Sequence, residues 1–312
     1  FERISVRSIW AVSCLIILIF PFVANILMLR QLSTNLHEEI GNTYYALLNG
    51  LGTTVDNALT EANGVAGSLS SNTYLSNLLQ TKNDTDRKYA SFSLSNTLYH
   101  QLHDNCRYSI RLFIYFPEWD LIVANDFYGP TAEYYQKKIA ASLIPYDEWI
   151  ENLTSAQSVN SIWNSSAAVE LGDGYRMEYD TVEYAKKLTP PYTTVKAPIL
   201  CASIRRDLMF PLSAGNAKQP VILVTNRKNL VLIRSGDIDE SFLQDFETPE
   251  EYQPVSVTLG GEPGTIWMVR SKRYTYQYYY LLPYQPFQEK AQAVLYLGLI
   301  VNGICLVLSG LT

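Results

Sequence analysis

Hydrophobic residues gather in two uncharged runs, one near each end of the chain. The first covers residues 8–29 and reads SIWAVSCLIILIFPFVANILML; the second covers residues 291–312 and reads AQAVLYLGLIVNGICLVLSGLT. A helix rises about 1.5 Å per residue and a hydrocarbon core is about 30 Å thick, so a helix of either run is long enough to cross it. The pattern predicts transmembrane helices over residues 8–30 and 287–312.

Cations beside the first run set the expected orientation. Arg3 and Arg7 precede it and Arg30 follows it, which favours a cytoplasmic N-terminus over residues 1–7 and an extracellular central domain. A cleaved signal peptide is the alternative for this run, but its apolar core is long for that and no small-residue cleavage site follows. With two spans the chain returns to the cytoplasm, and we expect a cytoplasmic output portion to follow Thr312.

Beyond the first run, apolar residues recur on one side of a helix. They are Leu32, Leu36, Ile40, Leu47, Leu51, Val55 and Leu59. This stripe predicts a long helix that opens an extracellular helical stalk over residues 31–105 and packs on its own domain. A second use of the stripe, against the same helix of another copy, would give a homodimer. The helix is expected to break near Ser71 and Asn72, and Asn83 offers a cap for the next amphipathic helix.

Two α+β modules follow, and each opens with a strand hairpin. In the first, RLFIYF turns at Pro117 and Glu118 into DLIVAN, followed by two short helices and three strands. In the second, PVILVTN and LVLIRS lead into a three-stranded meander. The predicted fold class is therefore α+β: a long N-terminal helix and two PAS-like modules with antiparallel sheets, over residues 106–206 and 219–286, joined by a connector at 207–218 and flanked by two transmembrane helices.

This layout resembles the double Cache (dCache) sensor domains of bacterial receptors. IYFPEWDLIVAND resembles the first hairpin of the membrane-distal module, PVILVTNRKNLVLIRS the same hairpin of the proximal module, and YYYLLPYQPFQEKAQAVLYLG the last strand with its exit into the second span. CLIILIFPFVANILMLRQ resembles the first span of membrane-anchored AraC-type regulators of Gram-positive bacteria, and sensor histidine kinases share much of this layout. The Tyr-plus-Arg-Trp-Tyr signature of the amino-acid-binding subgroup is missing, so the resemblance does not imply an amino-acid ligand.

Net charge and cysteine content limit which partners and which kind of fold this chain can have. The net charge of −6 argues against nucleic-acid binding by this segment. Cys14 and Cys305 lie in the apolar runs. Cys106 and Cys201 lie outside them and could form one disulfide, although a disulfide-built fold would carry many more cysteines.

Sequence motifs for catalysis and metal binding are missing. The sequence has no nucleophile elbow, zinc-protease motif or phosphate-binding loop, so we do not expect an enzyme. His100, His103 and Cys106 share a metal-like spacing, but the helix is expected to end near Asp104 and to prevent their convergence. The prediction is no metal and no cofactor.

Aromatic residues in the first module suggest a ligand pocket instead. A pocket needs apolar walls and a few polar groups that orient the ligand. Plain core packing is the alternative for each aromatic side chain. The candidate ligand-binding residues are Tyr115, Trp119, Asn125, Trp149, Trp163, Asp173, Tyr175, Tyr179 and Asp180.

These features predict the extracellular input region of a transmembrane sensor. A small molecule, such as a carbohydrate or peptide, or an extracellular binding protein would bind the distal module and favour one of two arrangements of the chain. The resemblance implies an AraC-type DNA-binding output in the cytoplasm, with a histidine kinase as the alternative output. A surface interaction protein without signalling is the alternative of a different class.

Overall fold

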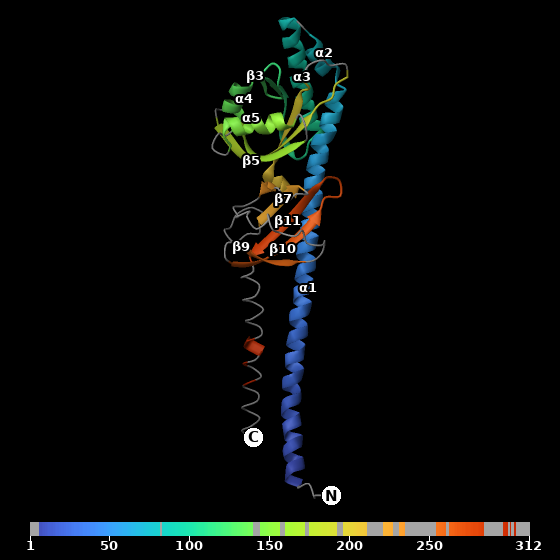
Figure 1. The fold of residues 1–312 in the computed structure, drawn as a ribbon, viewed down its shortest axis with the longest axis vertical. Helices are drawn as coiled ribbons and strands as arrows, with labels where there is room; N and C mark the ends of the chain where they lie inside the picture. Colours follow the sequence, from blue (N-terminus) through green and yellow to red (C-terminus); the bar gives the residue numbers. More distant parts are fainter. Residues whose placement is uncertain are drawn as a thin grey trace.

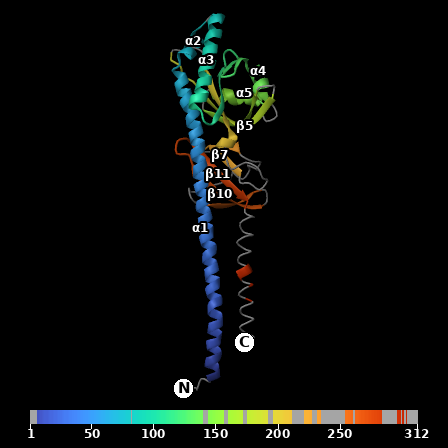
Figure 2. The ribbon, with the colours of Figure 1, turned by 180° about the vertical axis from the view of Figure 1, so that it is seen from behind.

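The chain folds into two antiparallel sheets that lie one beyond the other along a single long helix (Figure 1). Seen from behind, both sheets again lie on the same side of that helix (Figure 2). The predicted α+β class and the division into two sheets are thus confirmed. This computed structural model describes residues 6–81, 83–139, 144–156, 160–171, 175–191, 196–210, 221–226, 231–234, 254–259, 262–283, 296–298, 300 and 303.

The long helix α1 (Val6–Ser70) buries one side of its second half against both sheets. Leu51, Val55 and Leu59 of the predicted stripe are all buried in the main core cluster. The domain-packing role of the stripe is therefore confirmed for these residues. The side chains of Leu32, Leu36 and Ile40 lie outside what the structure describes.

Two asparagine side chains cap the N-terminal ends of the two helices that follow α1. The Asn72 side chain accepts the backbone N–H groups of Tyr74 and Leu75, at 2.9 and 3.2 Å, and begins α2 (Thr73–Gln80). The Asn83 side chain accepts the N–H of Thr85 at 3.0 Å and begins α3 (Asp84–Asn105). Each cap satisfies donors that a helix start otherwise leaves unpaired, so the expected break after α1 is confirmed.

The two predicted membrane spans stay predictions. Among the residues described here, no helix combines the length and the apolarity that a membrane crossing requires. The structure does not describe nearly all of residues 287–312 or most side chains of residues 8–30.

The first sheet has the strand order β3-β2-β1-β6-β5-β4, with every neighbouring pair antiparallel. Its inner face packs against α1 and α3, and helices α4 (Thr131–Lys138) and α5 (Tyr146–Ser155) cover its outer face. The strands are β1 (Ser109–Phe116), β2 (Leu121–Ala124), β3 (Phe127–Pro130), β4 (Ser161–Leu171), β5 (Tyr175–Lys187) and β6 (Ile199–Arg205).

The first hairpin turns where the sequence predicts. Phe116 pairs with Leu121, and the Trp119 N–H donates to the Phe116 carbonyl at 3.2 Å. Asp120 closes the turn with φ of 47°, a left-handed conformation that aspartate tolerates better than most residues. Strand β3 is an addition that the sequence analysis did not predict.

The second sheet has the order β8-β7-β11-β10-β9, and the short helix α6 (Arg206–Met209) leads out of the first sheet. Most of the connector predicted at 207–218 lies outside the described residues. The strands of the second sheet are β7 (Val221–Asn226), β8 (Val231–Arg234), β9 (Val255–Leu259), β10 (Glu262–Arg270) and β11 (Tyr276–Pro283).

The two cysteines outside the apolar runs, Cys106 and Cys201, are both free thiols.

Helix α1 is hydrogen-bonded to both sheets. The buried carboxylate of Asp56 accepts the hydroxyls of Ser271 and Tyr278, at 2.7 and 2.6 Å, in the second sheet. The carboxylate of Glu61 accepts the N–H groups of Arg107 and Tyr108, at 2.8 and 3.1 Å, just before β1. These bonds fix the position of α1 relative to each sheet.

We expect Gly52→Ala to destabilise the chain, because an added Cβ would lie 2.8 Å from the Tyr278 ring. Tyr278 is fully buried, so it has little room to move, and overpacking of this kind costs about 1–3 kcal/mol. Urea unfolding of the detergent-solubilised chain measures the effect. Gly50→Ala is the matched control: it lies on the same helix with nothing within 4 Å of the added Cβ, and alanine improves helix propensity. Equal stability changes for the two variants would contradict the prediction.

Candidate ligand-binding site

Strand alternation divides β1 between two environments. Leu112, Ile114 and Phe116 face the inner core with α1, whereas Phe113 and Tyr115 belong to the outer cluster under α4 and α5. Arg111 has the same parity as Phe113 and therefore points to the outer face. A charged side chain is thus built into the buried outer side of the sheet.

A polar row crosses the outer face at the level of Arg111. The strand register pairs Arg111 with Ser203, Ser203 with Glu183, and Glu183 with Trp163. These four residues, from β1, β6, β5 and β4, are called the polar row below. Arg111 is 1% exposed and Glu183 is 0% exposed. Buried charges are expensive unless they are paired and hydrogen-bonded, so the surroundings of each one matter.

Glu183 is held by three neighbouring side chains on the sheet. It accepts the Ser203 hydroxyl at 3.0 Å, and the Cys201 thiol and Thr181 hydroxyl each lie 3.4 Å from its carboxyl oxygens. Burial raises the pKa of the Glu183 carboxyl above its ordinary value, and the hydrogen bonds and Arg111 oppose this shift only in part. The same burial raises the pKa of the Cys201 thiol.

Arg111 is held from the side of α4. Its Nη1 donates to the carbonyl of Lys138 at 3.0 Å, and its Nε lies 3.7 Å from a carboxylate oxygen of Asp126. The Lys138 ammonium lies 2.9 Å from the other Asp126 oxygen. The end of α4 and the β2–β3 turn therefore close over the polar row through charged contacts.

Aromatic rings form the wall opposite the sheet. Ring centroids are 4.8 Å apart for Phe113 and Tyr134, 6.2 Å for Tyr134 and Trp149, and 5.5 Å for Tyr135 and Trp149. The Tyr135 hydroxyl donates to the Ile144 carbonyl at 2.5 Å. Helices α4 and α5 are thus joined to each other and to β1 by one aromatic stack.

Several buried polar atoms of this layer have no hydrogen-bond partner among the described residues. They are Trp149 Nε1, Trp163 Nε1, the Tyr134 hydroxyl and the Ser165 hydroxyl. Leaving a buried polar group unpaired costs roughly 1–3 kcal/mol. Four such groups between one sheet face and the two helices that cover it are what a site for a hydrogen-bonding ligand would contain.

Three of the predicted site residues meet in this layer, and two lie elsewhere. Tyr115, Trp149 and Trp163 belong to the outer cluster. Trp119 packs on the inner side instead, where its ring stacks on Phe116 with centroids 5.3 Å apart. Asn125 closes the hairpin end, and its side-chain oxygen accepts a backbone N–H from β1 at 3.3 Å.

Three of the remaining predicted residues, Tyr175, Tyr179 and Asp180, lie in the first half of β5. The Tyr179 ring lies under the guanidinium of Arg205, 5.2 Å from its centroid. Asp180 is exposed and lies 3.6 Å from Arg206 Nη1. Asp173 and the side chain of Tyr175 fall outside the described residues. Their binding roles, like those of the whole predicted set, stay predictions.

Sequence reasoning missed Arg111 and Glu183, the two charged members of the polar row. A signal was present in the strand pattern. Arg111 shares the parity of Phe113 and Tyr115, and Glu183 that of Ala185, so each is a charge on a face that the neighbouring residues bury.

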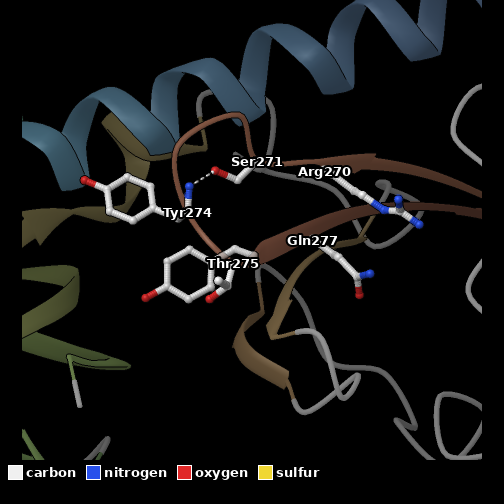
Figure 3. Close-up of a pocket in the computed structure, with 6 residues that line it drawn as sticks. Arg270, Ser271, Tyr274, Thr275 and Gln277 are labelled. Carbon is white, nitrogen blue, oxygen red and sulfur yellow. Dashed lines mark hydrogen bonds between the residues drawn. The ribbon is translucent and has the colours of Figure 1, made fainter.

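A separate pocket lies at the turn between β10 and β11, beside α1 (Figure 3). Its volume is about 430 Å³, and the Ser271 hydroxyl accepts the Tyr274 N–H at 2.8 Å on its wall. It belongs to the second sheet, whereas the predicted ligand-binding residues belong to the first. Its lining residues are Arg270, Ser271, Tyr274, Thr275, Tyr276 and Gln277.

Several solved structures resemble this chain at low sequence identity. No family model and no curated protein matches the chain. The sensory domain of the Campylobacter jejuni chemoreceptor Tlp3 with isoleucine bound is 12% identical, with a TM-score of 0.42 over 80% of this chain and 95% of its own. The ligand-binding domain of the Pseudomonas fluorescens chemoreceptor CtaA in complex with L-serine is 10% identical, with a TM-score of 0.45 over 79% and 98%.

A third solved structure is the extracellular domain of a proposed histidine kinase, soHK1S-Z6. It is 12% identical, with a TM-score of 0.48 over 84% of this chain and 99% of its own. Because all three TM-scores are below 0.5, these likenesses assign neither a family nor a ligand to this chain.

The raised pKa of Glu183 predicts a pH-dependent stability. As the pH rises above the ordinary glutamate value, the unfolded state loses its proton first and the folded state keeps one. Stability therefore falls as the pH rises through the window between the ordinary and the raised pKa, by up to about 1.4 kcal/mol per pH unit. Glu183→Gln removes this titration and should flatten the profile of unfolding free energy against pH. Glu178→Gln, which changes an exposed glutamate of the same strand, is the control. Parallel profiles for Glu183→Gln and the parent chain would refute the assignment.

Proposed function

We propose that this chain is the extracellular ligand-sensing input region of a transmembrane signalling protein. The observation that carries the proposal is the outer layer of the first sheet. It combines a buried arginine and glutamate with aromatic walls and four polar atoms that find no partner in the described part of the chain. A layer with no task beyond stability would gain from apolar residues of the same size, because buried ion pairs often cost more than they return.

The chemistry of the layer favours a ligand rich in oxygen acceptors. The indole nitrogens of Trp149 and Trp163 are donors only, as is the guanidinium of Arg111. The hydroxyls of Tyr134 and Ser165 add groups that donate or accept. Carbohydrates and peptides present such oxygens together with apolar surface that packs on aromatic rings. We infer that a small molecule of this kind binds here, either free or delivered by an extracellular binding protein.

The ligand site extends, on this proposal, to the predicted residues at the start of β5. Tyr175, Tyr179 and Asp180 belong to the strand that carries Glu183, and Asp173 precedes it. They would contact a ligand that reaches beyond the polar row. Tyr115, Trp149 and Trp163 would form its aromatic wall. Trp119 and Asn125 would act on the ligand only through the shape of the β1–β2 hairpin.

Helix α1 supplies a route from the ligand to the membrane. It is bonded to the start of β1 through Glu61 and to the β10–β11 turn through Asp56. A ligand that draws α4 and α5 onto the sheet favours one arrangement of both modules along α1, by as much as its affinity differs between the two arrangements. The uncharged runs support spans over 8–30 and 287–312, with both termini cytoplasmic. An AraC-type DNA-binding domain is the proposed output, and a histidine kinase is the alternative.

A thermal-shift screen of the full chain in detergent tests the ligand site. The library consists of sugars, oligosaccharides, organic acids and short peptides. A ligand that binds only the folded state raises the melting temperature with its concentration, by the equivalent of about 2.7 kcal/mol at 100 times its Kd.

We expect Trp163→Phe to weaken the binding of a hit at least tenfold, because it keeps a ring and removes the donor. Trp267→Phe is the matched control: that indole, in the second sheet, is also 6% exposed and also finds no partner among the residues described. The Kd of each variant is measured by titration calorimetry. Equal losses in both variants, or no hit from a folded chain, would contradict a small-molecule site in the first module.

A further inference from the structure

Exposed positions on α3 recur at alternating steps of four and three residues. Tyr89, Phe92 and Tyr99 are 72%, 73% and 46% exposed. On the opposite side of the same helix, Leu94 and Leu98 are fully buried in the main core cluster. We call the exposed row the α3 seam; its members are Thr85, Tyr89, Phe92, Asn96, Tyr99 and His103.

The spacing of the α3 seam is that of a helix pair. Steps of four and three average 3.5 residues, which is the repeat of the core positions in a coiled coil. Large aromatic side chains gathered on one exposed face mark interaction sites in soluble domains. The described residues of this chain place no other element over these three rings.

We propose that α3 pairs in parallel and in register with α3 of a second copy of the chain, which makes the α3 seam a dimer interface. The inference rests on the proposed membrane anchoring for its direction. α3 lies alongside α1, and both follow the long axis of the molecule (Figures 1 and 2). A two-fold axis along that direction keeps the N-terminal ends of both α1 helices at one end, as anchoring in one membrane requires; an antiparallel pair separates them.

The composition of the seam fits this register. Asn96 lies at its centre, four residues after one aromatic member and three before the next, which is the a position of the heptad. A single asparagine at an a position fixes the register and the number of strands in parallel helix pairs, because its amide meets the same amide of the partner helix. In a parallel pair, Lys88 lies opposite Ser93 and Ser95 opposite His100, so these flanking positions bring no like charges together at neutral pH.

The size of the seam also fits a pair of helices. Each aromatic member meets its own counterpart across the two-fold axis. Three aromatic side chains from each copy contribute several hundred Å², a large part of the roughly 800 Å² per partner of a standard interface.

The stripe on α1 is only partly available for pairing two copies. Of the whole stripe that the sequence offered for a homodimer, Leu51, Val55 and Leu59 are buried in their own domain, and the side chains of Leu32, Leu36 and Ile40 lie outside the described residues. The same core can be closed without the seam residues, because Leu94, Leu98 and Leu102 supply the buried side of α3.

Cysteine cross-linking of the full chain in nanodiscs tests the register. Asn96→Cys would place two thiols at the centre of the seam, where a mild oxidant such as oxidised glutathione joins them. Asp104→Cys is the control, since it is exposed on the same helix but off the seam. We expect Asn96→Cys to cross-link at least ten times faster than Asp104→Cys and than the unsubstituted chain. Equal rates would overturn the proposal.

Sedimentation of the detergent-solubilised chain gives a second measurement. Phe92→Lys brings two cations into one layer and should weaken dimerisation at least tenfold. Tyr128→Lys changes an exposed aromatic residue of β3 and should leave it unchanged. A monomeric parent, or a Phe92→Lys dimer as tight as the parent, overturns the proposal. Failure of this test is distinguishable from failure of the proposed ligand site, because Trp163-dependent binding of a small molecule is measured separately.

Discussion

The arrangement of the whole molecule depends on the carboxylate of Asp56. A buried charge is stable only when donors surround it, and here Ser271, Tyr278 and the N–H of Lys272 all point at the same group. Burial and the nearby carboxylate raise the pKa of the Tyr278 hydroxyl, which keeps it a donor. Gly52, one turn away, allows the Tyr278 ring to lie against the helix. Charge and steric fit together fix both the rotation and the height of α1 on the second sheet.

A second carboxylate, that of Glu61, fixes the position of α1 on the first sheet. It lies five residues after Asp56, about 7.5 Å farther along the helix, and accepts two backbone N–H groups at the entry to β1. Lys186 of β5 adds a hydrogen bond to Asn63. The two sheets therefore meet α1 through neighbouring turns, and a rotation of the helix against one sheet is felt by the other.

Hydrophobic patterning was sufficient for the main elements because they are long or repeat a clear period. The stripe that includes Val55 and Leu59 predicted α1, and two alternating runs around Pro117 predicted the first hairpin. The hydrophobic pattern did not predict strand β3, because its four residues, FYGP, include a glycine and a proline that argue against a strand. The side of the sheet on which Trp119 packs could not be predicted, since a residue within a turn follows no alternation; its ring lies with the inner cluster.

The site was harder to predict than the fold. Arg111 and Glu183 are residue types that usually face water, and their burial follows only from the packing of α4 and α5 over the sheet. α3 illustrates the same limit, since its sequence offers two apolar stripes. Only the structure shows that Leu94 and Leu98 face the core while Tyr89 and Phe92 face outward.

The β1–β2 hairpin connects the three regions discussed above. Its outer face carries Arg111 and Tyr115 of the proposed ligand site, and its entry is bonded to α1 through Glu61. On its inner face, the Ser95 hydroxyl of α3 donates to the Ala124 carbonyl of β2 at 2.6 Å. A ligand that shifts this hairpin therefore acts on α1 and α3 at once. Because α1 leads toward the proposed membrane span and α3 carries the seam, binding in the outer layer and the pairing of two copies would be coupled through a single two-stranded element.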